Sequence, residues 1–184
     1  MNFVISGPSA SGKSTVVRYL KQSDLALKFP VSATDRPPRE GEDINGVTYW
    51  FFTKKEFHKL ITAGAFLEHV HLEHTYGTLW EEIEKAKDHD VLLELDVQGA
   101  LKIREMYPEL SVLIFIAPPS LDELRRRLIE RNDGMDATER QKRLERALGE
   151  MAFMREYDHV VVNDDIEKCE EDVYNIIIQY LRKQ

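Results

Sequence analysis

The stretch that decides the fold lies at residues 2–17 and reads NFVISGPSASGKSTVV. It begins with the apolar, β-prone run Phe3–Ile5, which is typical of a strand buried on both faces. The spacing G-x-x-x-x-G-K-S follows from Gly7 to Ser14, and the apolar residues after it recur at the spacing of a helix with one buried side. A strand, a glycine-rich loop and a helix are therefore predicted in succession.

Between a strand and a helix, this glycine motif predicts a phosphate-binding loop. The backbone N–H groups of the loop and the positive end of the helix dipole converge on one point, where they hold a polyphosphate. Lys13 can reach the β- and γ-phosphates, and the Ser14 hydroxyl can ligate Mg²⁺. The alternative is an ordinary glycine turn beside a solvated lysine. The nucleoside triphosphate is expected to contact Gly7, Pro8, Ser9, Ala10, Ser11, Gly12, Lys13, Ser14 and Thr15.

Composition limits the class of protein. The 184 residues suffice for one well-buried domain with an inserted lobe, and 42% hydrophobic and 32% charged residues are typical of a soluble globular chain. The apolar runs are too short to span a bilayer, and an early core strand leaves no room for a signal peptide. The single cysteine, Cys169, excludes a disulfide framework and a multi-cysteine metal site. We therefore expect a cytoplasmic protein without membrane contact.

The formal net charge of −8 argues against nucleic-acid binding, which needs a basic field. Anionic nucleotides must instead be met by local clusters of arginine. The sequence leaves the oligomeric state open, as a monomer or a homo-oligomer.

Strands and helices alternate through much of the chain. Apolar runs predict buried strands at 91–97, 112–116 and 159–162, and segments with helical spacing lie between and after them. This alternation is typical of an α/β protein with a parallel sheet covered by helices on both faces, and ligands bind beyond the carboxyl ends of such strands. Glu94 and Asp96 would share one face of the 91–97 strand and supply acid groups near Mg²⁺.

Residues 31–88 read as a small α+β lobe inserted between two parts of the main domain. An extended segment and a proline-rich loop come first, followed by an aromatic, β-prone run at 47–52. A capping box at 53–56 opens a helix, and a strand is expected at 65–72. Residues 76–78 are expected to turn into a second short helix.

Further motifs follow one another in a characteristic order. They are GPS at 7–9, SATDRPPREGE at 32–42, FLE at 66–68, YGT at 76–78, VQG at 97–99, PPS at 118–120 and NDD at 163–165. In these motifs and in their order the chain resembles the guanylate kinases over essentially its whole length. The resemblance implies a three-layer P-loop NTPase core for ATP, an inserted lobe for GMP and a short lid that closes over the phosphates. The core would comprise 1–30, 89–130 and 146–184, the lobe 31–88 and the lid 131–145.

The resemblance assigns the reading of guanine to Glu68, with the hydroxyls of Ser32 and Thr78 as partners of the base. Guanine presents N1–H and N2–H side by side, so that one carboxylate can accept both, whereas adenine has an acceptor at N1. A site whose buried polar groups are left unpaired by the wrong substrate can discriminate by about 10⁴. Without the surrounding motifs, Glu68 would be read as a solvated strand residue.

The resemblance also assigns the phosphate contacts. Arg36 and Arg39, whose planar guanidinium groups can each make two hydrogen bonds to a phosphate, would hold the phosphate of GMP with the hydroxyls of Tyr49 and Tyr76. Glu42, Glu94 and Asp96 complete the residues expected around GMP. Arg131 and Arg143 of the lid would join Lys13, Arg36 and Arg39 as the catalytic cations, and Asn163 would lie near the adenine of ATP.

Three features depart from the family pattern. Ala10 stands where most guanylate kinases have glycine, so the backbone there is expected to adopt angles that alanine tolerates. Glu94 stands where the family usually has aspartate, and the segment before Tyr49 is one residue longer than usual. His69 and His71 share a strand face opposite Glu68 and are expected to face solvent rather than bind a metal.

The resemblance thus implies Mg²⁺-dependent transfer of the γ-phosphoryl group of ATP to GMP or dGMP in purine nucleotide metabolism. Two alternatives stay open. One is a kinase of the same fold that acts on another phosphorylated acceptor, against which Ser32, Glu68 and Thr78 speak. The other is a non-catalytic guanylate-kinase-like module that binds proteins, which would need neither Lys13 nor Ser14.

Overall fold

The computed structural model describes residues 1–42, 45–71, 74–130 and 137–183. The chain forms two compact units, one made of Met1–Ala26 with Leu93–Gln184 and the other of Leu27–Leu92. The second unit contains the predicted lobe 31–88 and extends it at both ends. Its ends are joined, because the Lys28 N–H donates to the Asp90 carbonyl over 2.8 Å and the Leu92 N–H donates to the Lys28 carbonyl over 2.9 Å.

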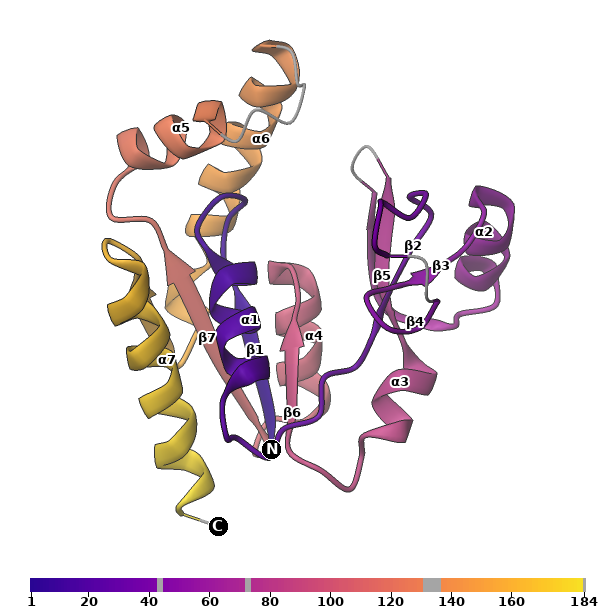
Figure 1. Ribbon diagram of the computed structural model, residues 1–184, viewed down its shortest axis with the longest axis horizontal. Coiled ribbons are helices and arrows are strands. Elements are labelled where there is room, and N and C mark those ends of the chain that lie inside the picture. Colours follow the sequence, from indigo (N-terminus) through magenta and orange to yellow (C-terminus); the bar gives the residue numbers. More distant parts are fainter. Residues whose placement is uncertain (43–44, 72–73, 131–136, 184) are drawn as a thin grey trace. The chain divides into compact units, whose positions relative to one another are not determined.

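A sheet of four strands forms the centre of the first unit (Figure 1). Its order is β6 (Val91–Glu94), β1 (Asn2–Ser6), β7 (Ser111–Ala117) and β8 (His159–Val162). The strand β7 pairs in parallel with β1 and with β8, and every residue of β7 is buried. The continuous apolar runs of the sequence therefore reflect strands covered on both faces, and the predicted parallel sheet is confirmed.

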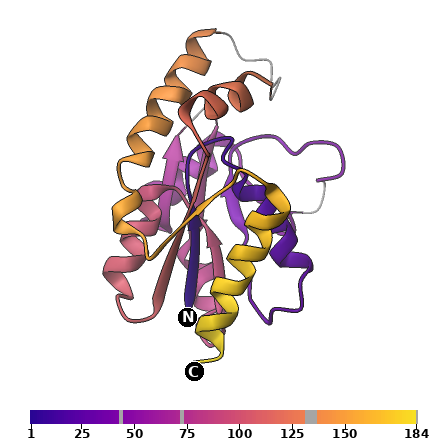
Figure 2. The same ribbon diagram turned by 90° about the vertical axis from the view of Figure 1, so that its left-hand side faces the viewer.

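Helices cover both faces of this sheet. Figures 1 and 2 show α1 (Lys13–Gln22) and α7 (Ile166–Leu181) on one face and α4 (Val97–Met106) on the other. The pair α5 (Leu121–Glu130) and α6 (Ala137–Met151) buries its own cluster of leucine and alanine side chains. The predicted three-layer α/β fold is confirmed.

The helix α6 ends at Met151. The N–H groups of Ala152 and Phe153 bond to carbonyls only three residues back, which tightens the last turn, and a 3₁₀ turn (η1, Met154–Glu156) follows. The charged composition of 137–156 does not indicate where the α-helix gives way to the 3₁₀ turn.

The second unit has a sheet of its own. Its strand order is β3 (Trp50–Phe51), β2 (Ser32–Thr34), β5 (Thr75–Leu79) and β4 (Phe66–His71), with β5 antiparallel to both neighbours. The helix α2 (Lys54–Thr62) packs against one face, and α3 (Trp80–Lys85) follows β5. The core stacks the rings of Phe57 and Phe66 with their centroids 4.5 Å apart.

Local predictions for this unit have mixed outcomes. The capping box is confirmed, since the Glu56 N–H donates to Thr53 Oγ1 and the Thr53 N–H donates to Glu56 Oε2. The turn predicted at 76–78 is wrong, because these residues lie inside β5, where pairing on both sides outweighs the local turn preference of glycine. The strand expected at 47–52 is reduced to Trp50–Phe51.

The prediction that Glu94 and Asp96 share one face of a strand is also wrong. The strand β6 ends at Glu94, and Asp96 is the N-cap of α4, where its carboxylate accepts the Gly99 N–H over 2.8 Å. Aspartate is a preferred N-cap residue, and this local bond ends the strand.

Within the described residues, we find no helix of the length and apolarity that a membrane span requires.

Candidate active site

The phosphate loop runs from the end of β1 to the start of α1, in the first unit. Gly7 has a φ of 141° and Gly12 a φ of 101°. A Cβ atom on Gly12 would lie 2.1 Å from Asn163 Nδ2, and one on Gly7 would lie 2.3 Å from the Ile116 carbonyl oxygen. Both glycines of the motif are therefore required by their backbone angles and by their close neighbours.

Ala10 does not behave as the sequence predicts. Its φ is 65°, and among the described residues it is the one non-glycine residue with a positive φ. The left-handed conformation costs an alanine about 1–2 kcal/mol. The expectation that the loop adopts angles suited to alanine is therefore wrong. The methyl group of Ala10 makes apolar contacts that partly offset this cost. It packs against buried residues of α5 and α6, namely Leu124, Leu128, Leu144 and Ala147.

Lys13 and Ser14, the two side chains of the motif that are expected to meet the phosphates and Mg²⁺, lie at the start of α1. Lys13 Nζ donates to the carbonyls of Gly7 and Pro8 over 2.6 and 2.9 Å, so that its charge lies against the loop. Ser14 Oγ donates to Glu94 Oε1 over 2.9 Å. A cation and an exposed pair of oxygen ligands thus flank the loop that the sequence predicts to hold a triphosphate.

These oxygens fit magnesium. Mg²⁺ prefers hard oxygen ligands and takes one or two of them from the protein, with water and substrate phosphates completing its shell. Ser14 and Glu94 are exposed and close together, whereas the Asp96 carboxylate is used as the cap of α4. In the part of the chain that the structure describes, no group of three or more His, Cys, Asp or Glu residues could hold a metal by itself. Mg²⁺ does not require such an all-protein site.

Asn163 is hydrogen-bonded to the backbone of the phosphate loop. Its side chain belongs to a residue only 4% exposed, and its amide donates to the Ser11 carbonyl over 2.7 Å. Its own backbone carbonyl accepts a bond from Arg127 Nη2 over 2.9 Å. The side-chain amide is thus occupied by the loop, and the expected contact with adenine stays a prediction.

Of the two expected lid arginines, Arg143 is half-buried on α6, and Arg131 lies outside the described residues. The same helix carries Glu150, which sequence reasoning missed. Burial raises the pKa of Glu150; the negative charge of Asp96 also raises it, and the positive charge of Lys13 opposes the shift. A carboxylate of α6 is therefore coupled to the lysine of the phosphate loop. Glu150 lies within a charged helical run, and nothing in that stretch of sequence indicates its interaction with Lys13.

The second unit brings the expected guanine-reading residues into one row across its sheet. Thr78 is the register partner of Ser32 on β2 and of Glu68 on β4. Thr78 Oγ1 donates to Glu68 Oε1 over 2.8 Å, and Thr78 is 2% exposed. A register shift between Phe66 and Glu68 sets the carboxylate opposite Thr78. We call Ser32, Thr78 and Glu68 the guanine row.

Arg36 is the most enclosed of the expected phosphate ligands, at 7% exposure. Its Nη2 pairs with Glu42 Oε2 over 2.8 Å, and its guanidinium lies 5.6 Å from the ring centroid of Tyr49. Burial alone would lower the pKa of Arg36, but the hydrogen bond and charge of Glu42, with a smaller contribution from Tyr76, raise it overall. The guanidinium is therefore held charged and oriented.

Glu42, which pairs with Arg36, also binds the backbone of Arg39. The Arg39 N–H donates to Glu42 Oε2 over 2.9 Å, and this bond, followed by that of Arg36, lowers the pKa of Glu42. The Arg39 side chain is exposed. The rings of Tyr49 and Tyr76 lie edge to face with centroids 6.0 Å apart. The structure thus groups Arg36, Glu42, Tyr49 and Tyr76, and it places the Arg39 backbone beside them.

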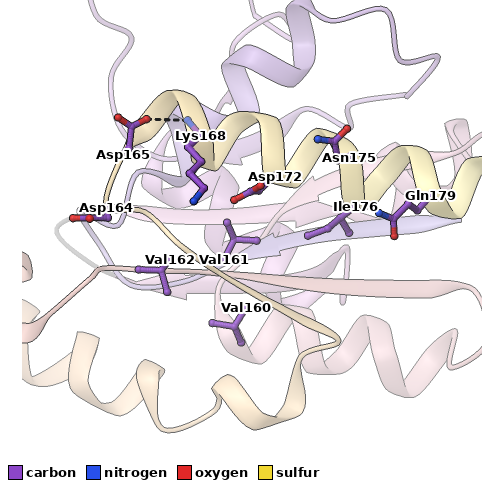
Figure 3. Close-up of a pocket in the computed structure, with 10 residues that line it drawn as sticks. All are labelled: Val160, Val161, Val162, Asp164, Asp165, Lys168, Asp172, Asn175, Ile176 and Gln179. Carbon is purple, nitrogen blue, oxygen red and sulfur yellow. Dashed lines mark hydrogen bonds between the residues drawn. The ribbon is translucent and has the colours of Figure 1, made fainter.

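A cavity of about 560 Å³ lies elsewhere in the first unit, between β8 and α7 (Figure 3). Its lining includes the exposed Val160 and Val162 of β8 and the polar face of α7, with Lys168 and Asp172. None of the residues predicted for nucleotide binding lines it. We therefore assign the cavity no part in the site.

Comparison with known proteins agrees with these features. The family model described as Guanylate kinase matches residues 1–180. A guanylate kinase of Bacteroides thetaiotaomicron is 42% identical, across 98% of this chain and 90% of the relative, and one of Caldanaerobacter subterraneus is 43% identical, across 95% and 85%. The crystal structure of guanylate kinase from Anaplasma phagocytophilum matches with a TM-score of 0.72 and 32% identity, across 98% of this chain and 85% of that one. The chain belongs to the guanylate kinase family.

Proposed function

We propose that the chain transfers the γ-phosphoryl group of ATP to GMP or dGMP, giving ADP and GDP, with Mg²⁺ bound at Ser14 and Glu94. Kinase activity on a nucleoside monophosphate follows from family membership. The observation that carries the choice of GMP is the guanine row, in which one carboxylate and two hydroxyls are aligned across three strands.

The guanine row distinguishes purines by donor and acceptor pattern. A carboxylate accepts hydrogen bonds and donates none when ionised, so Glu68 suits the adjacent N1–H and N2–H of guanine. Adenine would present its N1 acceptor to this half-buried carboxylate, and the carboxylate would lose the bonds that the two guanine donors make. Because Thr78 already donates to Glu68 Oε1, the carboxylate is held in place before the base arrives.

Transfer itself needs positioning and charge neutralisation more than a base, because the nucleophile is already a phosphate oxygen. Arg36 and Arg39, with the hydroxyls of Tyr49 and Tyr76, would hold the acceptor phosphate. Lys13 and the loop N–H groups would hold the triphosphate, and Arg131 and Arg143 would join them from the lid. Bound Mg²⁺ would supply further positive charge at the phosphates.

The test is a coupled assay of the purified protein with ATP, Mg²⁺ and a panel of GMP, dGMP, AMP, UMP and ribose phosphates. We expect turnover with GMP and none after removal of Mg²⁺ by a chelator. Equal rates with AMP would reject the role of the guanine row. Preference for a sugar phosphate would favour another acceptor, and the absence of turnover with every acceptor would favour a binding module. We further propose that the reaction takes place in the cytoplasm.

A further inference from the structure

Asp35 and Thr75 form a tight pair in the second unit, directly before two of the expected phosphate ligands. Asp35 follows β2 and precedes Arg36, and Thr75 begins β5 and precedes Tyr76. The Thr75 N–H donates to Asp35 Oδ1 over 2.7 Å, and the Thr75 hydroxyl donates to Asp35 Oδ2 over 2.9 Å. The Asp35 N–H in turn donates to the Thr75 carbonyl over 3.1 Å.

These bonds continue the β2–β5 ladder past the end of β2. The paired strands end at Thr34 and Tyr76, and beyond them the Asp35 carboxylate takes the place of a strand partner for Thr75. The Asp35 side chain is 6% exposed and Thr75 is 7% exposed. Hydrogen bonds to a charged acceptor are about twice as strong as neutral ones. The backbone at Asp35 and Thr75 is therefore closely fixed.

The pair lies on the face of the sheet that α2 covers. Side chains alternate along a strand, so Thr75 shares this face with its register partner His71, while Tyr76 and the guanine row occupy the other face. A small cavity of about 260 Å³ on the α2 side is lined by Asp35, Thr75 and His71, among others. The pair is thus behind the nucleotide residues and does not contact a base or phosphate bound to them.

Donor counting extends the network to His71. The Thr75 hydroxyl has one proton, which it donates to Asp35 Oδ2, so toward His71 Nδ1, 3.1 Å away, the hydroxyl oxygen can only accept. His71 must therefore carry a proton on Nδ1. His74 Nδ1 lies 3.6 Å from Asp35 Oδ1, the oxygen that accepts the Thr75 N–H. The order of donation is His71 to Thr75 to Asp35.

We propose that Asp35 is a positioning residue for the acceptor phosphate. Its carboxylate, bound to Thr75 on the α2 side of the sheet, fixes the spacing between Arg36 and Tyr76 on the nucleotide side. The inference rests on the proposed function, because it takes Arg36 and Tyr76 as ligands of the GMP phosphate. Thr34 supports the same geometry, since its hydroxyl donates to the Thr75 carbonyl and accepts the Arg36 N–H.

The first experiment measures steady-state kinetics of Thr75→Val and Thr75→Ser in the whole protein. Valine keeps the shape and the backbone bond to Asp35 but lacks the hydroxyl, whereas serine keeps the hydroxyl. We expect Thr75→Val to raise the KM for GMP about tenfold, because small misplacements of binding groups are costly. The KM for ATP should stay within about twofold, since the loop that holds ATP is untouched. Thr75→Ser should behave as the wild type.

The second experiment replaces the carboxylate. We expect Asp35→Ala to raise the KM for GMP about tenfold to a hundredfold, again with little change for ATP. Asp88→Ala, which removes an exposed carboxylate of the same unit, is the matched control and should leave both KM values unchanged. A role in stability alone would lower the melting temperature of the Asp35 and Thr75 variants without raising the KM for GMP, and that result overturns the proposal.

A spectroscopic readout keeps the test independent of activity. In Asp35→Asn the new amide can donate to the Thr75 hydroxyl oxygen, which frees the hydroxyl proton to turn toward His71 Nδ1. We expect the ¹⁵N shifts of His71 to change from the Nδ1–H to the Nε2–H form. An unchanged tautomer overturns the network. If the wild-type protein does not phosphorylate GMP, the proposed function fails. If it does, but Asp35→Ala and Thr75→Val keep its KM, only the positioning role fails.

Discussion

The two proposed nucleotide sites, at the phosphate loop and at the guanine row, are built in two different ways. The loop is one continuous stretch between β1 and α1, and its binding groups are mostly backbone N–H donors. Its shape depends on Gly7 and Gly12, which have positive φ values and close neighbours. Most side chains in the loop could therefore change without removing its donors.

The guanine row draws its members from three strands. Ser32, Thr78 and Glu68 come together only because β2, β5 and β4 pair in one register, with a shift between Phe66 and Glu68. A slip of one residue would turn every side chain of a strand to the opposite face. The comparison teaches that the proposed donor site depends on backbone conformation, whereas the proposed acceptor site depends on side-chain identity and on register.

The largest effect is expected from the one loop side chain that carries charge. Lys13→Ala should lower kcat at least about 10³-fold, because a fixed cation at the transferred phosphoryl group is lost. The fold should be unchanged, since the glycines and backbone donors remain. Steady-state assays with circular dichroism measure both quantities, and Arg18→Ala, an exposed cation on α1, is the control. Near-normal turnover would refute the phosphate-loop role.

The second effect tests whether the acceptor site depends on side-chain identity. Glu68→Gln keeps the size of the side chain but replaces one acceptor oxygen by a donor, so kcat/KM for GMP should fall by about 10²–10⁴. The ratio of GMP to AMP turnover should fall with it. Glu84→Gln, an exposed carboxylate of the same unit, should leave both unchanged. A variant that loses activity with GMP and AMP equally would show that Glu68 supports the sheet and does not read the base.

The same contrast explains what the sequence could predict. The loop was predictable because its motif is local and the flanking strand and helix have clear apolar periodicity. Candidates for the guanine row came from the family resemblance, but neither the register shift before Glu68 nor the row itself follows from spacing. The sequence predicts a turn at 76–78 because glycine favours turns locally, whereas pairing with β2 and β4 decides the conformation of these residues.

Two site features depended on non-local packing. The conformation of Ala10 is fixed by the tight loop and by contact with α5 and α6, which no local rule predicts. Asp96 reads as a strand residue until the start of α4 is known, after which its role as an N-cap is clear. Glu150 couples to Lys13 across more than a hundred residues of sequence, and helical spacing alone cannot show that.

The third effect is smaller and concerns loop conformation alone. Ala10→Gly removes about 1–2 kcal/mol of left-handed strain, but glycine loses more backbone entropy on folding and the methyl contact is lost. We therefore expect the free energy of unfolding to change by less than about 1 kcal/mol. Ala10→Val should destabilise by more than that, because a β-branched residue is a genuine outlier at positive φ. Denaturant unfolding measures both variants. Equal stability of the glycine and valine variants would contradict the backbone explanation of the loop.

The smallest effect is a pH dependence from Glu150, whose charge interacts with that of Lys13. Burial raises the pKa of Glu150 in the folded protein above its usual value of 4.5, so between these values the folded state binds more protons than the unfolded chain. The contribution of Glu150 to stability is therefore fully present below pH 4.5 and is lost as the pH rises through the folded pKa.

Glutamine does not titrate, so the melting temperature of Glu150→Gln relative to the wild type should increase between pH 4.5 and pH 8. Glu145→Gln, which removes an exposed carboxylate from the same helix, controls for the change of net charge. The opposite trend, in which the melting temperature of Glu150→Gln falls relative to the wild type as the pH rises, would mean that attraction to Lys13 outweighs burial. The loop lysine would then have an anionic partner on α6, and a side-chain ion pair would be part of a donor site otherwise built from backbone.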